Sequence, residues 1–211
     1  MAGVIFVCSD DGWESDVVYL HGALIAHGFK ASFLVHPMRV GQPHKLTWSQ
    51  LDSLGPDVQV CSHGQYPVDP RTLNDADLAA FLTQSRSALV AHGHTMGAKV
   101  FGPPQDDIDA RVQGAALAAG YQVIRSATLW VIPGITEFQL RGVASQKTLS
   151  SIQKRIDWCA AGPPTRGLAL VFHRIVETDP VGTQCDLVRV NWVLDAIAAS
   201  GCSVRHLTDW L

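Results

Sequence analysis

The chain lacks the long hydrophobic runs and the clustered positive charges of membrane proteins and nucleic-acid-binding proteins. No segment reaches the roughly 18 uninterrupted apolar residues of a membrane helix, so no membrane insertion is expected. No basic run could follow a phosphate backbone, and the net charge of -3 gives no reason to expect a nucleic-acid partner. The first residues also lack the pattern of an ordinary signal peptide. We therefore expect a protein that is cytoplasmic or is carried outside by another route.

Paired cysteines, linkers and repeats are lacking as well. The 5 cysteines show no C-x-x-C spacing, and their odd number favours free thiols over a disulfide scaffold or a zinc finger. The sequence contains no linker, internal repeat or low-complexity segment. With 47% hydrophobic and 17% charged residues, the 211 residues suit one globular domain over 1–211.

Short apolar runs alternate along the chain with longer segments of helical periodicity. The run 4–9 predicts a buried strand, and the spacing of apolar residues in 14–29 predicts a helix that Gly28 ends. Thr47 and Gln50 form a capping box at the start of a short helix. The same patterns predict further strands at 30–35, 57–64, 121–127 and 167–176, a strand and turn at 99–104, a short last strand and turn at 203–211, and helices at 72–93, 107–120, 148–161 and 187–201. This order predicts an α/β protein with a mostly parallel sheet or a barrel.

Polar side chains follow the predicted strands, at the edge where the chemistry of such folds is found. Asp10 and Asp11 follow the first strand, whereas His63 and His173 follow two later ones. Carboxylates and imidazoles bind zinc or a similar ion, whose bound water can attack a carbonyl group near neutral pH. One aspartate can bind the ion while the other takes a proton from the attacking water. The pattern predicts a metal-assisted hydrolytic site.

Each of these residues also has a purely structural interpretation. Two aspartates before a glycine are common in turns and helix caps, where their side chains accept hydrogen bonds from nearby N–H groups. A histidine at a strand end is often only solvated or hydrogen-bonded. The joint placement of four such residues on one parallel array is what favours a functional site.

Five segments, taken in order, resemble the motifs of a known family. They are VCSDDGWESDVVYLHGALIAHGFKASFLV, VGQPHKLTWSQLDSLG, VCSHGQYPVDPRTLNDADL, FGPPQDDIDARVQGAALAAGYQ and GLALVFHRIV. Over residues 4–210 the chain resembles the polysaccharide deacetylases (carbohydrate esterase family 4, nodulation-protein type). The resemblance implies a distorted (β/α) barrel that removes N- or O-acetyl groups from an acetylated glycan or a small acetylated sugar.

The resemblance also implies roles for individual residues. Asp10 would be the general base and His173 the general acid. Asp11 and His63 would bind a divalent metal ion, with zinc as the favoured ion. The substrate would contact four further residues, of which Gln105 would place its backbone N–H near the oxyanion: Trp13, Tyr66, Pro104 and Gln105.

One departure from the family pattern affects the metal site. The family has a second histidine four residues after the first, and Pro67 stands there in this sequence. Proline offers no lone pair to a metal. Three residues are candidates for the missing ligand: Asp69, Gln65 and Asp106.

Other departures affect the walls of the site. The tyrosine and glycine of the third motif are replaced by Gln105 and Asp106, and the aspartate that often orients the catalytic base is missing beside Trp130. The carboxylate that would orient His173 is not identified by spacing, with Glu177 and Asp179 as alternatives.

Three functions are compatible with these features. The first is a metal-dependent deacetylase with a substituted third ligand. The second is a glycan-binding or structural module that has lost the chemistry, as a component of a larger assembly such as a virus particle. The third is a hydrolase of a different amide or ester. The retained aspartates and histidines favour an enzyme, whereas Pro67 argues against ordinary zinc catalysis.

Overall fold

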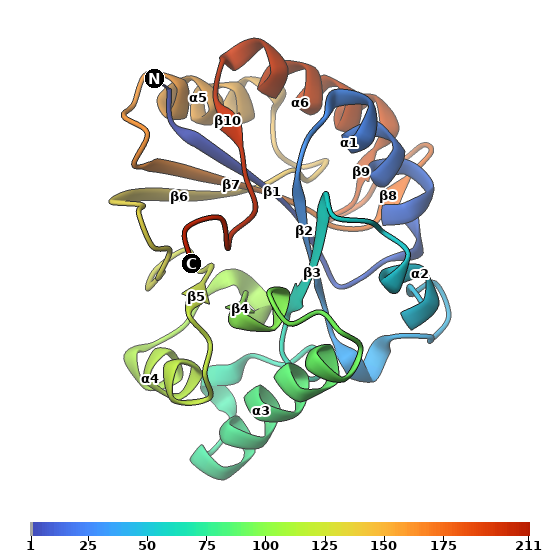
Figure 1. Ribbon diagram of the computed structural model, residues 1–211. Coiled ribbons are helices and arrows are strands. Elements are labelled where there is room, and N and C mark those ends of the chain that lie inside the picture. The colour runs from blue at the N-terminus through green and yellow to red at the C-terminus, as the bar shows by residue number, and fades with distance from the viewer. Residues whose placement is uncertain (1) are drawn as a thin grey trace.

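The computed structural model describes residues 2–211 as a curled parallel sheet surrounded by helices (Figure 1). The strands of the main sheet are β1 Val4–Asp10, β2 Ala31–Val35, β3 Val58–Ser62, β4 Val100–Phe101, β5 Val123–Ile124, β6 Glu137–Gly142, β7 Arg166–Phe172 and β10 Ser203–Val204. A separate small sheet pairs β8 Ile175–Val176 with β9 Cys185–Asp186. The α-helices are α1 Gly22–His27, α2 Trp48–Asp52, α3 Asp75–Ala91, α4 Ala110–Ala118, α5 Leu149–Ala160 and α6 Leu187–Ser200. The short helical turns are the π-helical η1 Asp16–His21 and the 3₁₀ turns η2 Pro37–Arg39, η3 Pro70–Thr72, η4 Gly97–Lys99 and η5 Pro104–Asp106.

The sheet is a half-barrel whose strands all run in one direction. Its order is β5-β4-β3-β2-β1-β7-β6, and every pairing is parallel. β10 pairs with the first residues of β1 and β2 pairs with the last ones, so the two strands share one edge of β1. The structure confirms the predicted distorted (β/α) barrel, and β5 and β6 form its two ends.

Alternate residues of the central strands belong to two different hydrophobic cores. In β1, Ile5 and Val7 pack in the outer core beneath α1, α5 and α6. The other apolar residues of β1 belong to the inner core of the barrel: Val4, Phe6 and Cys8. Because both faces are buried, the strand is a continuous apolar run, which is why the sequence predicts it. The inner series ends at Asp10, which is 1% exposed and therefore brings a carboxylate to the mouth of the barrel.

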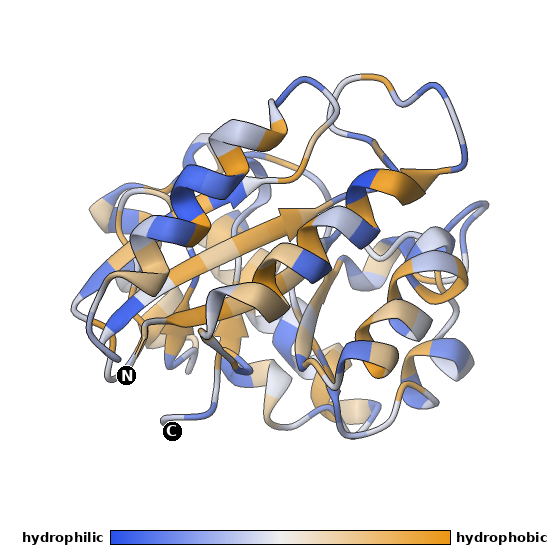
Figure 2. Cartoon of the chain, turned by 90° about the horizontal axis from the view of Figure 1, so that it is seen from above, coloured by the Kyte–Doolittle hydropathy of each residue, from blue (hydrophilic) through white to orange (hydrophobic). Residues whose placement is uncertain are grey.

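The hydropathy of the chain follows these layers. Figure 2 shows hydrophobic colour along the strands and hydrophilic colour on parts of the surrounding helices. A third core lies between α3, α4 and the strands β4 and β5 at one end of the sheet. Within residues 2–211, no helix combines the length and the apolar character that a bilayer span requires.

The structure differs from the predicted strands in two places that matter for the site. The strand predicted at 121–127 is shortened to the two residues of β5, so Arg125 lies just after it. The strand predicted at 167–176 is interrupted between β7 and β8, which places His173 in a loop at the barrel mouth. The sequence did not predict β6, because this edge strand is half-exposed and mostly polar and lacks an apolar run.

Gly64, which follows His63, offers a test of packing at the end of β3. Its φ is +78°, and an added Cβ would lie 1.9 Å from Cζ of Phe81. Gly41 has a similar φ of +80° but open space around the Cβ position. We expect Gly41→Ala to lower the free energy of unfolding by about 1–2 kcal/mol because of its backbone conformation alone. Gly64→Ala should cost about 1–3 kcal/mol more because of the clash.

Urea denaturation of both variants measures the two costs. Equal losses would show that Phe81 moves away freely and that the end of β3 is not tightly packed.

Candidate functional site

Three ligand-type side chains converge at the carboxyl ends of three neighbouring strands. Asp11 follows β1, His36 follows β2 and His63 follows β3. One ligand atom of each lies within 4.8 Å of the other two, and no other group of three His, Cys, Asp or Glu does so within residues 2–211. Oδ1 of Asp11 lies 3.3 Å from Nε2 of His36 and 3.8 Å from Nε2 of His63. The parallel register of the strands brings these residues together.

Backbone carbonyl groups orient both imidazoles. Nδ1 of His63 donates to the oxygen of Gly102 at 2.6 Å, and Nδ1 of His36 donates to the oxygen of Gly64 at 3.2 Å. A carbonyl oxygen only accepts, so each Nδ1 carries its hydrogen and each Nε2 faces the cluster. Burial above all, and then the neighbouring charge of His36, lower the pKa of His63 to about 3. The His63 imidazole is therefore neutral and has a lone pair on Nε2.

Asp11 is held in an unusual backbone conformation as a carboxylate. Its φ is +74°, which non-glycine residues rarely adopt. Lys45 Nζ donates to its backbone oxygen at 3.0 Å, and Trp13 Nε1 donates to Oδ2 at 3.3 Å. Burial opposes ionisation, but the hydrogen bond from His36 and the charges of His36 and Lys45 outweigh it and lower the pKa of Asp11 below its usual range. These contacts fix the charged Asp11 carboxylate at the end of β1.

The three side chains fit a divalent metal ion. His36 Nε2 faces Oδ1 of Asp11 while its Nδ1 is already bonded to a carbonyl oxygen. The contact is favourable only if Nε2 carries a second proton or if a cation lies between the two groups. One carboxylate and two imidazoles, each with Nδ1–H bonded to a carbonyl oxygen, are a donor set that zinc uses.

The third member of the cluster is His36 and none of the residues that the sequence suggested for the third ligand position. Asp69 caps η3 and pairs with Arg71 at 2.8 Å, and it lies outside the cluster of three. Asp106 also lies outside it. The side-chain oxygen of Gln65 is buried and has no hydrogen-bond partner within residues 2–211. The signal that could have identified His36 is its place directly after a predicted strand, the same signal that identified His63.

A buried arginine that the sequence analysis missed binds the second aspartate. Arg125 is fully buried, and its Nη2 lies 2.8 Å from Oδ2 of Asp10 and 2.9 Å from Oδ1 of Asp106. Burial opposes its charge, but Asp10 and Asp106 raise the pKa of Arg125 above its ordinary value. Burial also raises the pKa of Asp106, against the effect of Arg125. Arg125 orients Asp10 although the expected aspartate beside Trp130 is missing.

The cluster opens into a cavity of about 330 Å³. Its lining contains most of the predicted site residues: Asp11, His63, Pro104, Gln105 and His173, together with Pro67, Val68 and Thr183. Gln105 lies in η5 with a φ of +66°. The gap between β7 and β8 supplies His173. The sequence analysis gave two carboxylates that could orient His173, Glu177 and Asp179. Of these, Glu177 already accepts a hydrogen bond from the hydroxyl of Tyr19 at 3.0 Å.

The two aromatic residues predicted to contact substrate lie elsewhere. Tyr66 packs edge-on against Phe81, with 5.4 Å between ring centroids, and is not part of the lining of this cavity. Trp13 donates to Asp11, and Lys45 Nζ lies 3.0 Å from the centroid of its ring. Burial lowers the pKa of Lys45 to about 8. Trp13 lines a neighbouring cavity instead.

Removal of Arg125 should leave the buried Asp10 carboxylate and the partly exposed Asp106 carboxylate without a counter-ion. We expect Arg125→Met to lower the free energy of unfolding by about 3–5 kcal/mol, because Asp10 and Asp106 lose their shared counter-ion. As a control, Arg111→Met removes an exposed pair with Asp75, 2.9 Å long, and should cost about 0–1 kcal/mol. Denaturant unfolding of the metal-free protein measures both values. Similar losses of unfolding free energy in the two variants would contradict a structural role for the contacts of Arg125 with Asp10 and Asp106.

Comparisons with known proteins identify the fold. No family model matches the sequence, and no curated protein matches it. The family 4 carbohydrate esterase from Streptomyces lividans, in complex with acetate, superposes with a TM-score of 0.67 at 15% identity, over 96% of this chain and 91% of that chain. The chitin deacetylase from the fungal pathogen Colletotrichum lindemuthianum superposes with a TM-score of 0.67 at 18% identity, over 100% and 88%.

A third structure of the same fold is described as a pseudoenzyme. This family 4 protein from Bacillus anthracis superposes with a TM-score of 0.66 at 13% identity, over 99% of this chain and 66% of that chain. At such low identities the likeness establishes the fold. The chain has the (β/α) barrel fold of the family 4 carbohydrate esterases.

Proposed function

We propose that the chain is a divergent polysaccharide deacetylase that uses a divalent metal ion to remove acetyl groups from glycans or small acetylated sugars. The observation that carries this proposal is the cluster of Asp11, His36 and His63, which restores three metal ligands where Pro67 removed one. The cluster opens into the same cavity as His173, on a fold shared with deacetylases.

The metal ion would be held by Asp11, His36 and His63. Zinc or a similar ion bound there would polarise the acetyl carbonyl group and make a bound water more acidic. The neutral His63 and the charged Asp11 are already in the protonation states that a metal requires.

Asp10 is placed to act as the general base. Its Oδ2 is held by Arg125, whereas its Oδ1 is buried and has no hydrogen-bond partner within residues 2–211. A buried acceptor without a donor is costly, so Oδ1 is suited to take a proton from water at this place. The contact of Arg125 Nη2 with Oδ2 would hold the Asp10 carboxylate in place, with Oδ1 left for the water.

Two groups on the cavity wall complete the reaction. His173, in the loop after β7, would donate a proton to the departing amine or alkoxide. The backbone N–H of Gln105 has no acceptor within residues 2–211 and lies on a turn that lines the cavity. It would donate to the oxyanion, a contribution typically worth about 3–4 kcal/mol.

A glycan-binding module without catalysis is the second candidate. It is favoured by the substitution at Pro67 and by the pseudoenzyme among the structures of the same fold. A mutant of that pseudoenzyme is described as having restored enzymatic activity. The two candidates differ in metal binding and in acetate release.

Zinc binding tests whether Asp11, His36 and His63 act as metal ligands. We expect one zinc ion per chain, and His36→Ala should weaken zinc affinity by more than the roughly 10–100-fold that loss of a supporting contact costs. Asp69→Asn should leave the affinity unchanged, because Asp69 pairs with Arg71. Calorimetric titration of metal-free protein with zinc measures both variants. Unchanged binding by His36→Ala would contradict the role of His36.

Acetate release from chitin oligomers tests the base. Asp10→Asn should lower kcat by about 10²–10⁴-fold, since an amide cannot take the proton. Asp195→Asn, at an exposed site on α6, serves as the control and should not change kcat. Zinc content and circular dichroism of Asp10→Asn should match those of the parent protein. A parent protein that binds zinc but releases no acetate from any acetylated glycan would support the binding module.

A further inference from the structure

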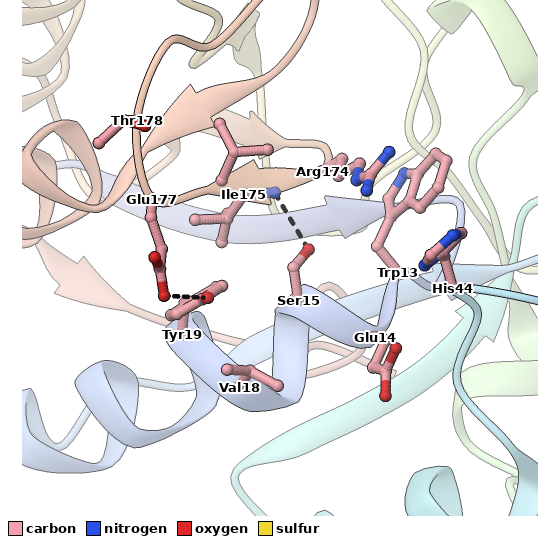
Figure 3. Close-up of a pocket in the computed structure, with 11 residues that line it drawn as sticks. Trp13, Glu14, Ser15, Val18, Tyr19, His44, Arg174, Ile175, Glu177 and Thr178 are labelled. Atoms are coloured by element: carbon pink, nitrogen blue, oxygen red, sulfur yellow. Dashed lines mark hydrogen bonds between the residues drawn. The ribbon is translucent and has the colours of Figure 1, made fainter.

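A second cavity, of about 380 Å³, lies beside the catalytic cavity (Figure 3). Three connections join the two. Trp13 lines the second cavity and hydrogen-bonds to Asp11, which lines the first. His173 lines the first cavity and the next residue, Arg174, lines the second. The two cavities are therefore neighbours on either side of Trp13, close enough for adjacent units of one ligand.

The loop between β8 and β9 forms the third connection. It contributes Thr178 to the second cavity and Thr183 to the catalytic one. One loop thus contacts both halves of any ligand that spans the two cavities.

Positive charge gathers at the Trp13 end of the second cavity. The guanidinium carbon of Arg174 lies 5.5 Å from the centroid of the Trp13 ring, and Lys45 Nζ lies 3.0 Å from the same centroid. Within residues 2–211, neither cation has a carboxylate within 4.0 Å. His44 lines the same end. Lys45 is buried beside Asp11 and does not line the cavity, so Arg174 is the cation that faces it without a carboxylate partner among the described residues, and such a cation favours an anion at this place.

The two carboxylates of the cavity do not neutralise this end. Glu177 lies at the opposite end, where it accepts a hydrogen bond from Tyr19 at 3.0 Å. Glu14 is exposed, and Figure 3 shows its carboxylate pointing away from Arg174. The cavity is therefore polar at one end and cationic at the other.

We propose that Arg174, with Lys45 and His44 nearby, binds an anionic group of the acetylated glycan whose acetyl group occupies the catalytic cavity. The anionic group is a carboxylate or a phosphate, since the planar donor fork of arginine pairs with either. This inference rests on the proposed function and narrows its substrates to acidic acetylated glycans.

Binding of three matched disaccharides tests the inference. They are N,N′-diacetylchitobiose (called chitobiose below), the same disaccharide with one lactyl ether that adds a carboxylate, and its 6-phosphate. Calorimetric titration of the metal-free protein measures affinity without catalysis, and acetate release by the zinc-loaded protein is measured separately. We expect either or both charged disaccharides to bind about tenfold more tightly than chitobiose, which is the usual size of one hydrogen bond to a charged group. The arm that shows the gain identifies the anion.

Arg174→Gln should abolish that gain and leave chitobiose binding within twofold of the parent value. Arg174→Lys should retain part of the gain, and Arg155→Gln, at an exposed arginine on α5, should retain all of it. If Arg174→Gln loses the same factor of affinity for all three disaccharides, the inference is overturned. It is also overturned if the parent protein binds neither charged disaccharide more tightly than chitobiose. An Arg174-dependent gain without acetate release would support the anionic subsite and contradict the deacetylase proposal.

Discussion

The site depends on how the negative charges of two adjacent carboxylates at the end of β1 are compensated by the groups around them. Asp10 faces the barrel interior, where the buried guanidinium of Arg125 compensates it. Asp11 turns the other way through a left-handed backbone conformation and meets two imidazoles and the Lys45 ammonium group. His63 lies 3.8 Å from both carboxylates, whereas of the two Arg125 contacts only Asp10 and His36 only Asp11, and the proposed separate roles of the two aspartates rest on this difference.

The geometry of a parallel sheet explains how a lost ligand can be replaced. Residues that directly follow neighbouring strands lie side by side at one edge, so a ligand can be supplied from any of them. Pro67 follows β3 where the resembled family has a histidine, and His36 places an imidazole beside His63 from the end of β2. The same argument applies to the base, because Arg125 after β5 and Asp106 in η5 reach Asp10 from loops other than the expected one.

Periodicity and local chemistry made most of the framework predictable. The buried strands β1, β2, β3 and β7 are apolar runs because both of their faces are covered, and the capping box at Thr47 is a local pattern. The half-exposed β6 was not predicted, because its residues carry no such run. Strand-end position singled out Asp10, Asp11, His63 and His173, and the same criterion applies to His36, but Arg125 lay inside the strand predicted at 121–127 and follows a strand only in the structure.

The sequence by itself determined the order of strands and helices, the polar residues at the strand ends and the departure at Pro67, because these are properties of neighbouring residues. Only the tertiary structure decided that His36 joins Asp11 and His63, that Arg125 bridges Asp10 and Asp106, and that Asp69 pairs with Arg71 instead. The physical reason is that a contact between residues 25 or 115 positions apart is set by strand register and by the direction in which each side chain leaves its strand. Neither quantity is encoded in the local pattern.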